Sequence, residues 1–226
     1  MSKLLQRIKR SFKKLKGDPY RGLNTAERFE RIYQSNDWKD QESVSGPGSS
    51  KEQTEEVVRI LNKVITEYKI QRIADIPCGD FGWMKDVDLN GASYIGGDIV
   101  KELIKENTNR YVDRAECSFE LIDLLSDPIP NADLLLVRDC TVHLSHEQVH
   151  LALENIRKSN VKYLLTTTFT EVDKNADIHT GDWRPLNMCR APFNLPEPKA
   201  VFNEKCTENN GRYADKSLAL WEVDKL

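Results

Sequence analysis

Hydrophobic positions from residue 51 onward alternate between helical spacing and short continuous runs. Helical spacing marks residues 51–68, 99–111 and 145–158. Apolar runs of strand length lie at residues 70–76, 94–97, 118–122, 133–137 and 162–169. Strands as apolar as these are buried on both faces. We therefore predict an α/β fold in which helices cover both faces of a mostly parallel, doubly wound sheet.

The C-terminal part of the chain departs from this alternation. Residues 199–206 and 217–223 have strand character, and Asn209-Asn210-Gly211 between them favours a turn. We predict an antiparallel hairpin here, which brings the sheet to seven strands. Residues 170–198 show no regular pattern. A stretch of this length without secondary structure inside a domain is usually functional, so we predict a ligand-binding insertion.

The first 17 residues predict a basic amphipathic helix. Residues 1–16 hold seven lysines and arginines and no acid, with apolar side chains at helical spacing. Such a helix fits peripheral contact with an anionic membrane surface, docking on a partner, or simple solubility of the terminus. The sequence does not choose among these three roles.

A helix and a polar stretch make up residues 18–50, ahead of the domain that we predict over residues 51–226. The helix is expected over residues 24–38, and residues 43–50 are small, polar and turn-rich. Two interpretations fit this turn-rich stretch equally. It is a flexible linker, or it is a loop whose backbone closes over a ligand, because glycine and serine permit close approach.

Composition and charge narrow the function. The whole chain carries −3 and the first 16 residues +7, so the rest carries −10. We expect no nucleic-acid partner, because neutralising phosphates requires a basic face. Neither a signal peptide nor a membrane-spanning stretch is evident, which predicts a cytoplasmic protein, at the inner face of the membrane if the basic helix binds there. Five cysteines without a Cys-x-x-Cys pair argue against a disulfide framework and a zinc ribbon.

Acidic residues follow four successive predicted strands. They are Asp75, Asp98, Asp123 and Asp139. The carboxyl ends of parallel strands meet at one edge of a sheet, where ligands bind. A sharp turn at Gly79 follows the first acid and permits close approach of the backbone to a ligand. Carboxylates at this edge favour a nucleoside that carries hydroxyls and positive charge over one that carries phosphates.

These residues resemble class I S-adenosylmethionine-dependent methyltransferases. The turn after the first strand is similar to the Asp-x-Gly-x-Gly-x-Gly loop of that family, with Asp75 as the leading acid and Gly79 as the central glycine. Pro77 and Phe81 stand where the family has its other glycines. More narrowly, residues 43–50, 75–84, 138–144 and 166–198 resemble a bacterial subgroup of small methyltransferases that often accompany cell-surface polysaccharide genes. The resemblance spans about residues 38–223 and implies a Rossmann-like sheet and S-adenosylmethionine as cofactor.

The resemblance also implies a set of cofactor contacts. Asp98 would hold the ribose hydroxyls, and Asp123 would face the adenine amine with Leu124 nearby. Phe81 and Trp83 would cover the sulfonium through cation–π contact. The full set of implied cofactor-binding residues is Asp75, Pro77, Cys78, Gly79, Phe81, Trp83, Asp98, Ile99, Asp123, Leu124 and Arg138.

Asp139 and His143 are the candidate catalytic residues, because they follow the fourth strand where an acceptor would meet the methyl group. Asp139 would orient the imidazole, and His143 would act as general base. Cys140, His143, His146 and His150 have a spacing that suggests a metal face. However, Ser145 begins a helix after His143 and leaves that histidine outside it, so we predict no metal site.

Five polar or aromatic residues in the irregular segment are of the types that bind sugar hydroxyls and ring faces. These predicted acceptor-binding residues are His179, Asp182, Trp183, Arg184 and Asn187. The resulting hypothesis is methyl transfer to a small molecule, with a hydroxyl of a sugar or glycan precursor as the expected acceptor. The alternatives are a methyltransferase of protein or nucleic acid, and a non-catalytic module that binds S-adenosylmethionine.

Overall fold

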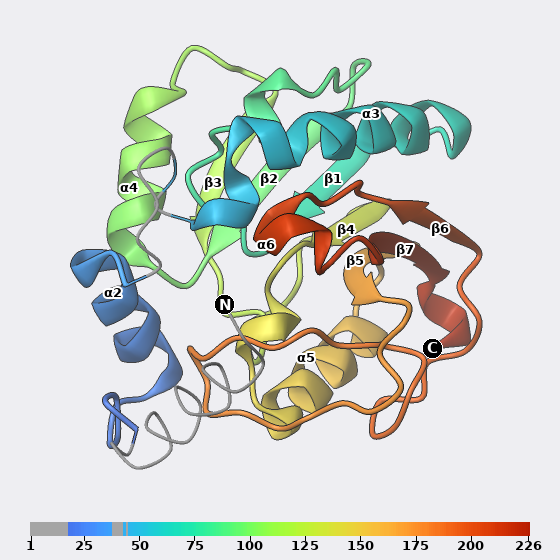
Figure 1. The fold of residues 1–226 in the computed structure, drawn as a ribbon. Coiled ribbons are helices and arrows are strands. Elements are labelled where there is room, and N and C mark those ends of the chain that lie inside the picture. Colours follow the sequence, from blue (N-terminus) through green and yellow to red (C-terminus); the bar gives the residue numbers. More distant parts are fainter. Residues whose placement is uncertain (1–17, 38–42, 44) are drawn as a thin grey trace.

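A seven-stranded sheet in the order β3-β2-β1-β4-β5-β7-β6 forms the centre of the structure, a computed structural model that describes residues 18–37, 43 and 45–226 (Figure 1). The strands are β1 (Arg72–Asp75), β2 (Ser93–Asp98), β3 (Cys117–Leu121), β4 (Leu134–Val137), β5 (Tyr163–Phe169), β6 (Ala200–Asn203) and β7 (Lys216–Glu222). The helix predicted over residues 1–17 lies outside the described residues.

The sheet is parallel through its first five strands and antiparallel at β7. β1 pairs in parallel with both β2 and β4, while β7 runs antiparallel to β5 and to β6. The Rossmann-like architecture with a C-terminal antiparallel hairpin is therefore confirmed. The hairpin connection contains the short α6 (Glu208–Gly211), in which Asn209 and Asn210 adopt left-handed backbone angles.

Helices cover both faces of the sheet because neighbouring strand residues point to opposite sides. Leu134 and Leu136 of β4 belong to the core that includes apolar side chains of α3 (Lys51–Glu67). Leu135 of the same strand packs into the core that includes Ala152 and Ile156 of α5 (His146–Lys158). Figure 1 shows α3 and α5 on opposite sides of the sheet.

The helix α2 (Thr25–Ser35) lies beside α4 (Lys101–Arg110), away from the sheet itself (Figure 1). Its first turn is closed by a capping box between Asn24 and Glu27. It ends earlier than the predicted residue 38, because Asn36 takes a left-handed conformation that stops the helix. The Tyr33 hydroxyl donates to Glu106 of α4 at 3.1 Å.

Residues 170–198 contain no helix or strand, as the missing periodicity predicted. Buried polar side chains hold this segment in place instead. Asn175 donates to the backbone carbonyl of Asn187 at 2.9 Å, and its own side-chain oxygen accepts the amide of that residue. Over the described residues, no helix combines the length and apolar character needed to cross a bilayer.

Candidate functional site

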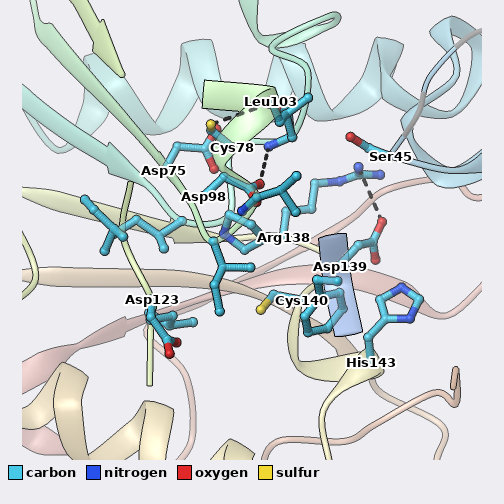
Figure 2. A pocket seen from close by; sticks show the side chains of 18 of the residues that line it. Ser45, Asp75, Cys78, Asp98, Leu103, Asp123, Arg138, Asp139, Cys140 and His143 are labelled. Atoms are coloured by element: carbon cyan, nitrogen blue, oxygen red, sulfur yellow. Dashed lines mark hydrogen bonds and ion pairs between the residues drawn. The ribbon is translucent and has the colours of Figure 1, made fainter. Parts of the chain in front are cut away.

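A pocket opens at the carboxyl edge of the parallel strands, where the four acids of the sequence prediction converge (Figure 2). Its empty space, together with the solvent at its mouth, is about 1080 Å³. Its lining consists of Thr25, Phe29, Tyr33, Ser45, Ser49, Asp75, Ile76, Pro77, Cys78, Gly79, Trp83, Asp98, Ile99, Val100, Leu103, Ile122, Asp123, Leu124, Leu125, Arg138, Asp139, Cys140, His143 and Leu144. Ten of the eleven cofactor candidates and both catalytic candidates are in this set.

Asp75 is the last residue of β1 and is 2% exposed. The hydroxyl of Tyr94 donates to its carboxylate at 2.8 Å. Burial raises the pKa of Asp75 to about 7, and the hydrogen bond from Tyr94 opposes that rise. A carboxyl group with this pKa changes its charge near neutral pH and gains from a cation placed beside it.

Asp98 ends β2 and holds the turn that follows β1. Its carboxylate accepts the backbone amide of Gly79 at 3.2 Å and that of Val100 at 3.0 Å. Burial raises the pKa of Asp98 to about 6, against the stabilising effect of these amides. The carboxylate is thus fixed at the pocket wall, in a place where it can accept hydrogen bonds from vicinal hydroxyls.

The turn-rich stretch of residues 43–50 packs onto the turn after β1. Gly79 has a φ of +57°, and a Cβ atom built on it would lie 2.4 Å from the Ser45 hydroxyl oxygen. The Ser43 hydroxyl donates to Asp80 at 2.7 Å. Ser45 and Ser49 line the pocket, so this stretch forms part of the pocket wall.

Asp123 lies beyond the end of β3, at the far side of the pocket from His143 (Figure 2). One oxygen of its carboxylate accepts the backbone amide of Leu125 at 2.9 Å. Leu124, between them, is 5% exposed and lines the same wall. The carboxylate and the apolar side chain together match the needs of a flat heterocycle with an exocyclic amine.

Three buried charged residues and the partly buried Asp139 form a cluster at the end of β4. Arg138 donates to Glu204 at 2.8 Å and to the carbonyl of Gly48, in the 43–50 loop, at 2.9 Å. Lys216, the first residue of β7, donates to Asp139 at 2.6 Å. Burial disfavours the Asp139 charge, but Lys216 and Arg138 outweigh that effect and lower its pKa to about 2.

His143 ends the short 3₁₀ helix η3 (Thr141–His143), which follows the charged cluster. Its Nδ1 lies 2.9 Å from the backbone carbonyl oxygen of Asp182. A carbonyl only accepts, so Nδ1 carries the proton and Nε2 is the basic nitrogen. Burial lowers the pKa of His143 to about 4, which leaves the imidazole neutral at pH 7. We expected the Asp139 side chain to orient this ring, whereas Nδ1 donates its hydrogen bond to the backbone carbonyl of Asp182.

Phe81 is a correction to the predicted cofactor set. It is 1% exposed and stacks among Tyr94, Tyr111 and Phe119 in the core, away from the pocket lining. These three rings come from β2, the C-cap of α4 and β3, and their contacts hold Phe81 in the core. Trp83 does line the pocket, and its ring lies 5.4 Å from the Arg138 guanidinium.

The five predicted acceptor-binding side chains are not part of the pocket lining. Arg184 is 2% exposed and donates to the backbone carbonyls of Thr141 and Leu144 at 2.6 and 2.5 Å, so it supports the His143 segment from behind. Asn187 is 6% exposed and donates to backbone carbonyls within its own segment. Both predictions are corrected, because these side chains are occupied by structural hydrogen bonds.

The other three residues have different surroundings. Asp182 contributes its backbone carbonyl to His143, as described above. His179 is exposed. Trp183 is 37% exposed and stacks edge-on against Phe169 and Tyr213. The structure therefore brings this segment next to the candidate base without placing its side chains inside the pocket.

Three lining residues of α2 escaped the sequence prediction. Thr25, Phe29 and Tyr33 recur every four residues and form one face of that helix, which covers the pocket. Their spacing was readable as an amphipathic stripe, but nothing in the sequence indicated that the stripe faces a ligand. Over the described ranges, no group of three His, Cys, Asp or Glu residues is placed to hold a metal ion.

Comparison with known proteins connects this geometry to one class of fold. No family model and no curated protein sequence matches the chain. Among solved structures, human N-acetylserotonin methyltransferase in complex with SAM aligns over 89% of this chain at 13% identity, with a TM-score of 0.59. The aligned region corresponds to 60% of the human enzyme, so the chain spans less than two thirds of that protein.

Two further structures align over nearly their whole length. Magnesium protoporphyrin IX methyltransferase from Synechocystis PCC 6803, with bound SAM, shares 10% identity over 88% of this chain and 97% of its own, with a TM-score of 0.58. The PH0226 protein from Pyrococcus horikoshii OT3 shares 15% identity over 89% and 99%, also with a TM-score of 0.58. At these identities the comparison establishes a shared fold, and that fold is Rossmann-like.

Proposed function

We propose that this protein is an S-adenosylmethionine-dependent methyltransferase. The observation that carries the proposal is the convergence of Asp75, Asp98, Asp123 and Asp139 on one pocket (Figure 2). Each lies at the end of a different strand or just beyond it, and a nucleoside with hydroxyls, an exocyclic amine and a cationic centre satisfies such a set. The shared fold supports the same conclusion, since two of the aligned structures are methyltransferases with bound SAM.

The pocket residues fit this cofactor in a definite order. Asp98 would accept the two ribose hydroxyls, Asp123 would accept the adenine amine, and Leu124 would pack against the ring. Asp75 lies near the Gly79 turn, where its carboxyl group would face the positive end of the ligand. The 43–50 loop would close over the turn, since its Ser45 already packs on Gly79. When bound, S-adenosylmethionine supplies an electrophilic methyl group.

His143 and Asp139 divide the work on the acceptor between them. His143 is neutral at pH 7 and presents Nε2 as the basic nitrogen, so it can remove a proton from a hydroxyl. Asp139 stays ionised because of Lys216 and Arg138, and its carboxylate is already bound by these two cations. Asp139 would instead accept a hydrogen bond from the acceptor and stabilise the imidazolium that forms.

We further propose that the acceptor is a small molecule with a free hydroxyl, and that a sugar or glycan precursor is the best candidate. A general base is needed for a hydroxyl, which supports an oxygen acceptor. An ionised carboxylate beside a neutral histidine is well suited to hold a polyhydroxylated ring. The resemblance of residues 43–50, 75–84, 138–144 and 166–198 to methyltransferases that accompany cell-surface polysaccharide genes supports the same class.

The test is methyl transfer from S-adenosylmethionine with a ¹³C-labelled methyl group to a panel of monosaccharides and nucleotide-linked sugars. The expected result is S-adenosylhomocysteine together with a labelled methyl ether on one panel member. His143→Gln should lose this product and keep the fold. Label that appears only in added protein or nucleic acid, and never in a sugar, would contradict the acceptor class.

A further inference from the structure

Lys216 lies behind the candidate acceptor site and outside the pocket lining. It is the first residue of β7, and its side chain is 5% exposed. Antiparallel pairing with Phe169 brings it from the far end of the sequence to the carboxyl edge of β5. There its ammonium group lies 2.6 Å from the Asp139 carboxylate and 3.5 Å from Glu204. Lys216 therefore acts on the pocket through its contact with Asp139, which lines it.

Asp139 needs this support because its backbone is held in an unfavourable conformation. Its φ is +52°, which is uncommon for a residue other than glycine. The backbone amide donates to the Thr167 hydroxyl at 2.9 Å, and the carboxylate is bound by Lys216 and by Arg138 at 3.3 Å. A conformation of this kind persists only where surrounding contacts enforce it, and it aims the carboxylate toward the pocket beside His143 (Figure 2).

We propose that Lys216 is a positioning residue, which fixes the Asp139 carboxylate in its charged form at the acceptor side of the pocket beside His143. The role of Lys216 in methyl transfer rests on the proposed function. Its effect on the charges of Asp139 and His143 does not depend on that function. Held in this way, Asp139 binds the acceptor hydroxyl and His143 takes the proton. The proton therefore moves from the acceptor oxygen to His143 Nε2, and Asp139 gains and loses none.

The charges around both groups determine how each variant acts. Asp139 is faced by Lys216 of β7, Arg138 at the end of β4 and His143 of η3, with Glu204, just after β6, bound to both cations. Glu208 of α6 also acts on Arg138.

His143 is faced by Asp139, which favours its protonation, and by Arg184 and Lys216, which oppose it. Loss of the Lys216 charge therefore raises the pKa of His143, whereas loss of the Asp139 charge lowers it.

The experiment is an NMR titration of the His143 imidazole in the full-length protein, assigned with His143→Gln. In Lys216→Met, the His143 pKa should rise by roughly one unit, a ~10-fold gain in proton affinity. In Asp139→Asn, it should fall below the wild-type value of about 4. A general loosening of the structure would move the pKa toward its ordinary value in both variants, so the opposite signs are specific to the proposed arrangement.

A second readout is calorimetric binding of S-adenosylhomocysteine. Lys216→Met should bind it like the wild type, because Lys216 does not line the cofactor wall. Lys199→Met, which removes the exposed partner of Glu222, is the matched control and should change neither readout. If Lys216→Met does not fold, Lys216→Gln removes the same charge and carries the same expectations.

Two results would overturn the proposal. An unchanged His143 titration in both Lys216 variants would show that the lysine does not act on this pair. Loss of S-adenosylhomocysteine binding in step with the shifted titration would show a merely structural role. Failure of the wild type to bind S-adenosylhomocysteine would count against the proposed function instead, and the His143 titration would still decide the electrostatic inference.

Discussion

The Nδ1 atom of His143 lies 2.9 Å from the backbone carbonyl oxygen of Asp182, a residue 39 positions away in the chain. This hydrogen bond fixes the tautomer and the orientation of the imidazole. It also gives the irregular segment after β5 a role at the site, because Asp182 belongs to that segment. The segment contributes the backbone carbonyl that orients the candidate base. The guanidinium of Arg184 holds the segment to the carbonyls of Thr141, the first residue of η3, and Leu144, just after η3.

His143→Gln should slow methyl transfer by ~10²–10⁴-fold, the usual contribution of a general base. Affinity for S-adenosylhomocysteine should stay close to that of the wild type, because the histidine lies on the acceptor side. Steady-state kinetics with calorimetry on the same samples checks both statements. At saturating S-adenosylmethionine and acceptor, the wild-type kcat should stay flat across neutral pH and fall only as pH approaches the His143 pKa of about 4. A fall centred near pH 6.5 would contradict the assignment.

Asp98→Ala should weaken S-adenosylhomocysteine binding by ~1–3 kcal/mol, because hydrogen bonds from the ribose to a charged acceptor are lost. Calorimetric titration measures the change, and thermal unfolding shows how much of the fold is retained without the bonds to Gly79 and Val100. Asp113→Asn, at an exposed turn outside the pocket lining, is the control. Equal affinities for Asp98→Ala and the wild type would remove Asp98 from the site.

Binding of S-adenosylmethionine should become tighter as pH rises toward 7. Burial raises the pKa of Asp75 to about 7 in the free protein, so this carboxyl group is mostly protonated below that pH. A bound sulfonium favours the carboxylate and lowers its pKa, so binding releases a proton. Affinity then rises by up to ~10-fold per pH unit below 7 and levels off above it.

S-adenosylhomocysteine provides the matched comparison for this prediction, because it has the same nucleoside and amino acid without the sulfonium charge. Its affinity should depend on pH less steeply than that of S-adenosylmethionine between pH 5 and 7. Tyr94→Phe removes the hydrogen bond that holds down the Asp75 pKa, so it should move the steep region to higher pH. Identical slopes for the two ligands would show that Asp75 does not face the sulfonium.

Gly79→Ala should lower the free energy of unfolding by ~1–3 kcal/mol, because the residue has a left-handed backbone and its new Cβ would meet Ser45. Ser45→Gly in the same chain should restore the part that comes from the clash. Urea denaturation of the two single variants and the double variant measures this coupling. Simple additivity of the two substitutions would mean that the 43–50 loop does not rest on the turn.

The sequence was sufficient to predict the fold and the convergence of the four acids on one pocket, for a topological reason. Parallel strands end at a common edge of the sheet. Asp75 and Asp98, which end the adjacent strands β1 and β2, must therefore become neighbours. That inference needs no knowledge of side-chain packing. The helices on both faces of the sheet could be predicted in the same way, because strands that are apolar on both sides must be covered on both sides.

The acceptor side could not be predicted in the same way, because it depends on contacts between distant segments. Arg184 and Asn187 have side chains suited to a ligand, but in the folded protein these side chains donate hydrogen bonds to backbone carbonyls. Phe81 packs in the core against aromatic side chains from three other segments. Lys216 reaches Asp139 only through the antiparallel register of β7, which spacing along the chain does not reveal.

The most direct test of the central claim is a calorimetric titration of the full-length wild-type protein with S-adenosylmethionine at pH 7.5. The account predicts saturable binding of one ligand per chain in the micromolar range. The four carboxylates that converge on the pocket would supply the contacts for this binding. Absence of any binding heat at millimolar ligand, for both S-adenosylmethionine and S-adenosylhomocysteine, would contradict it.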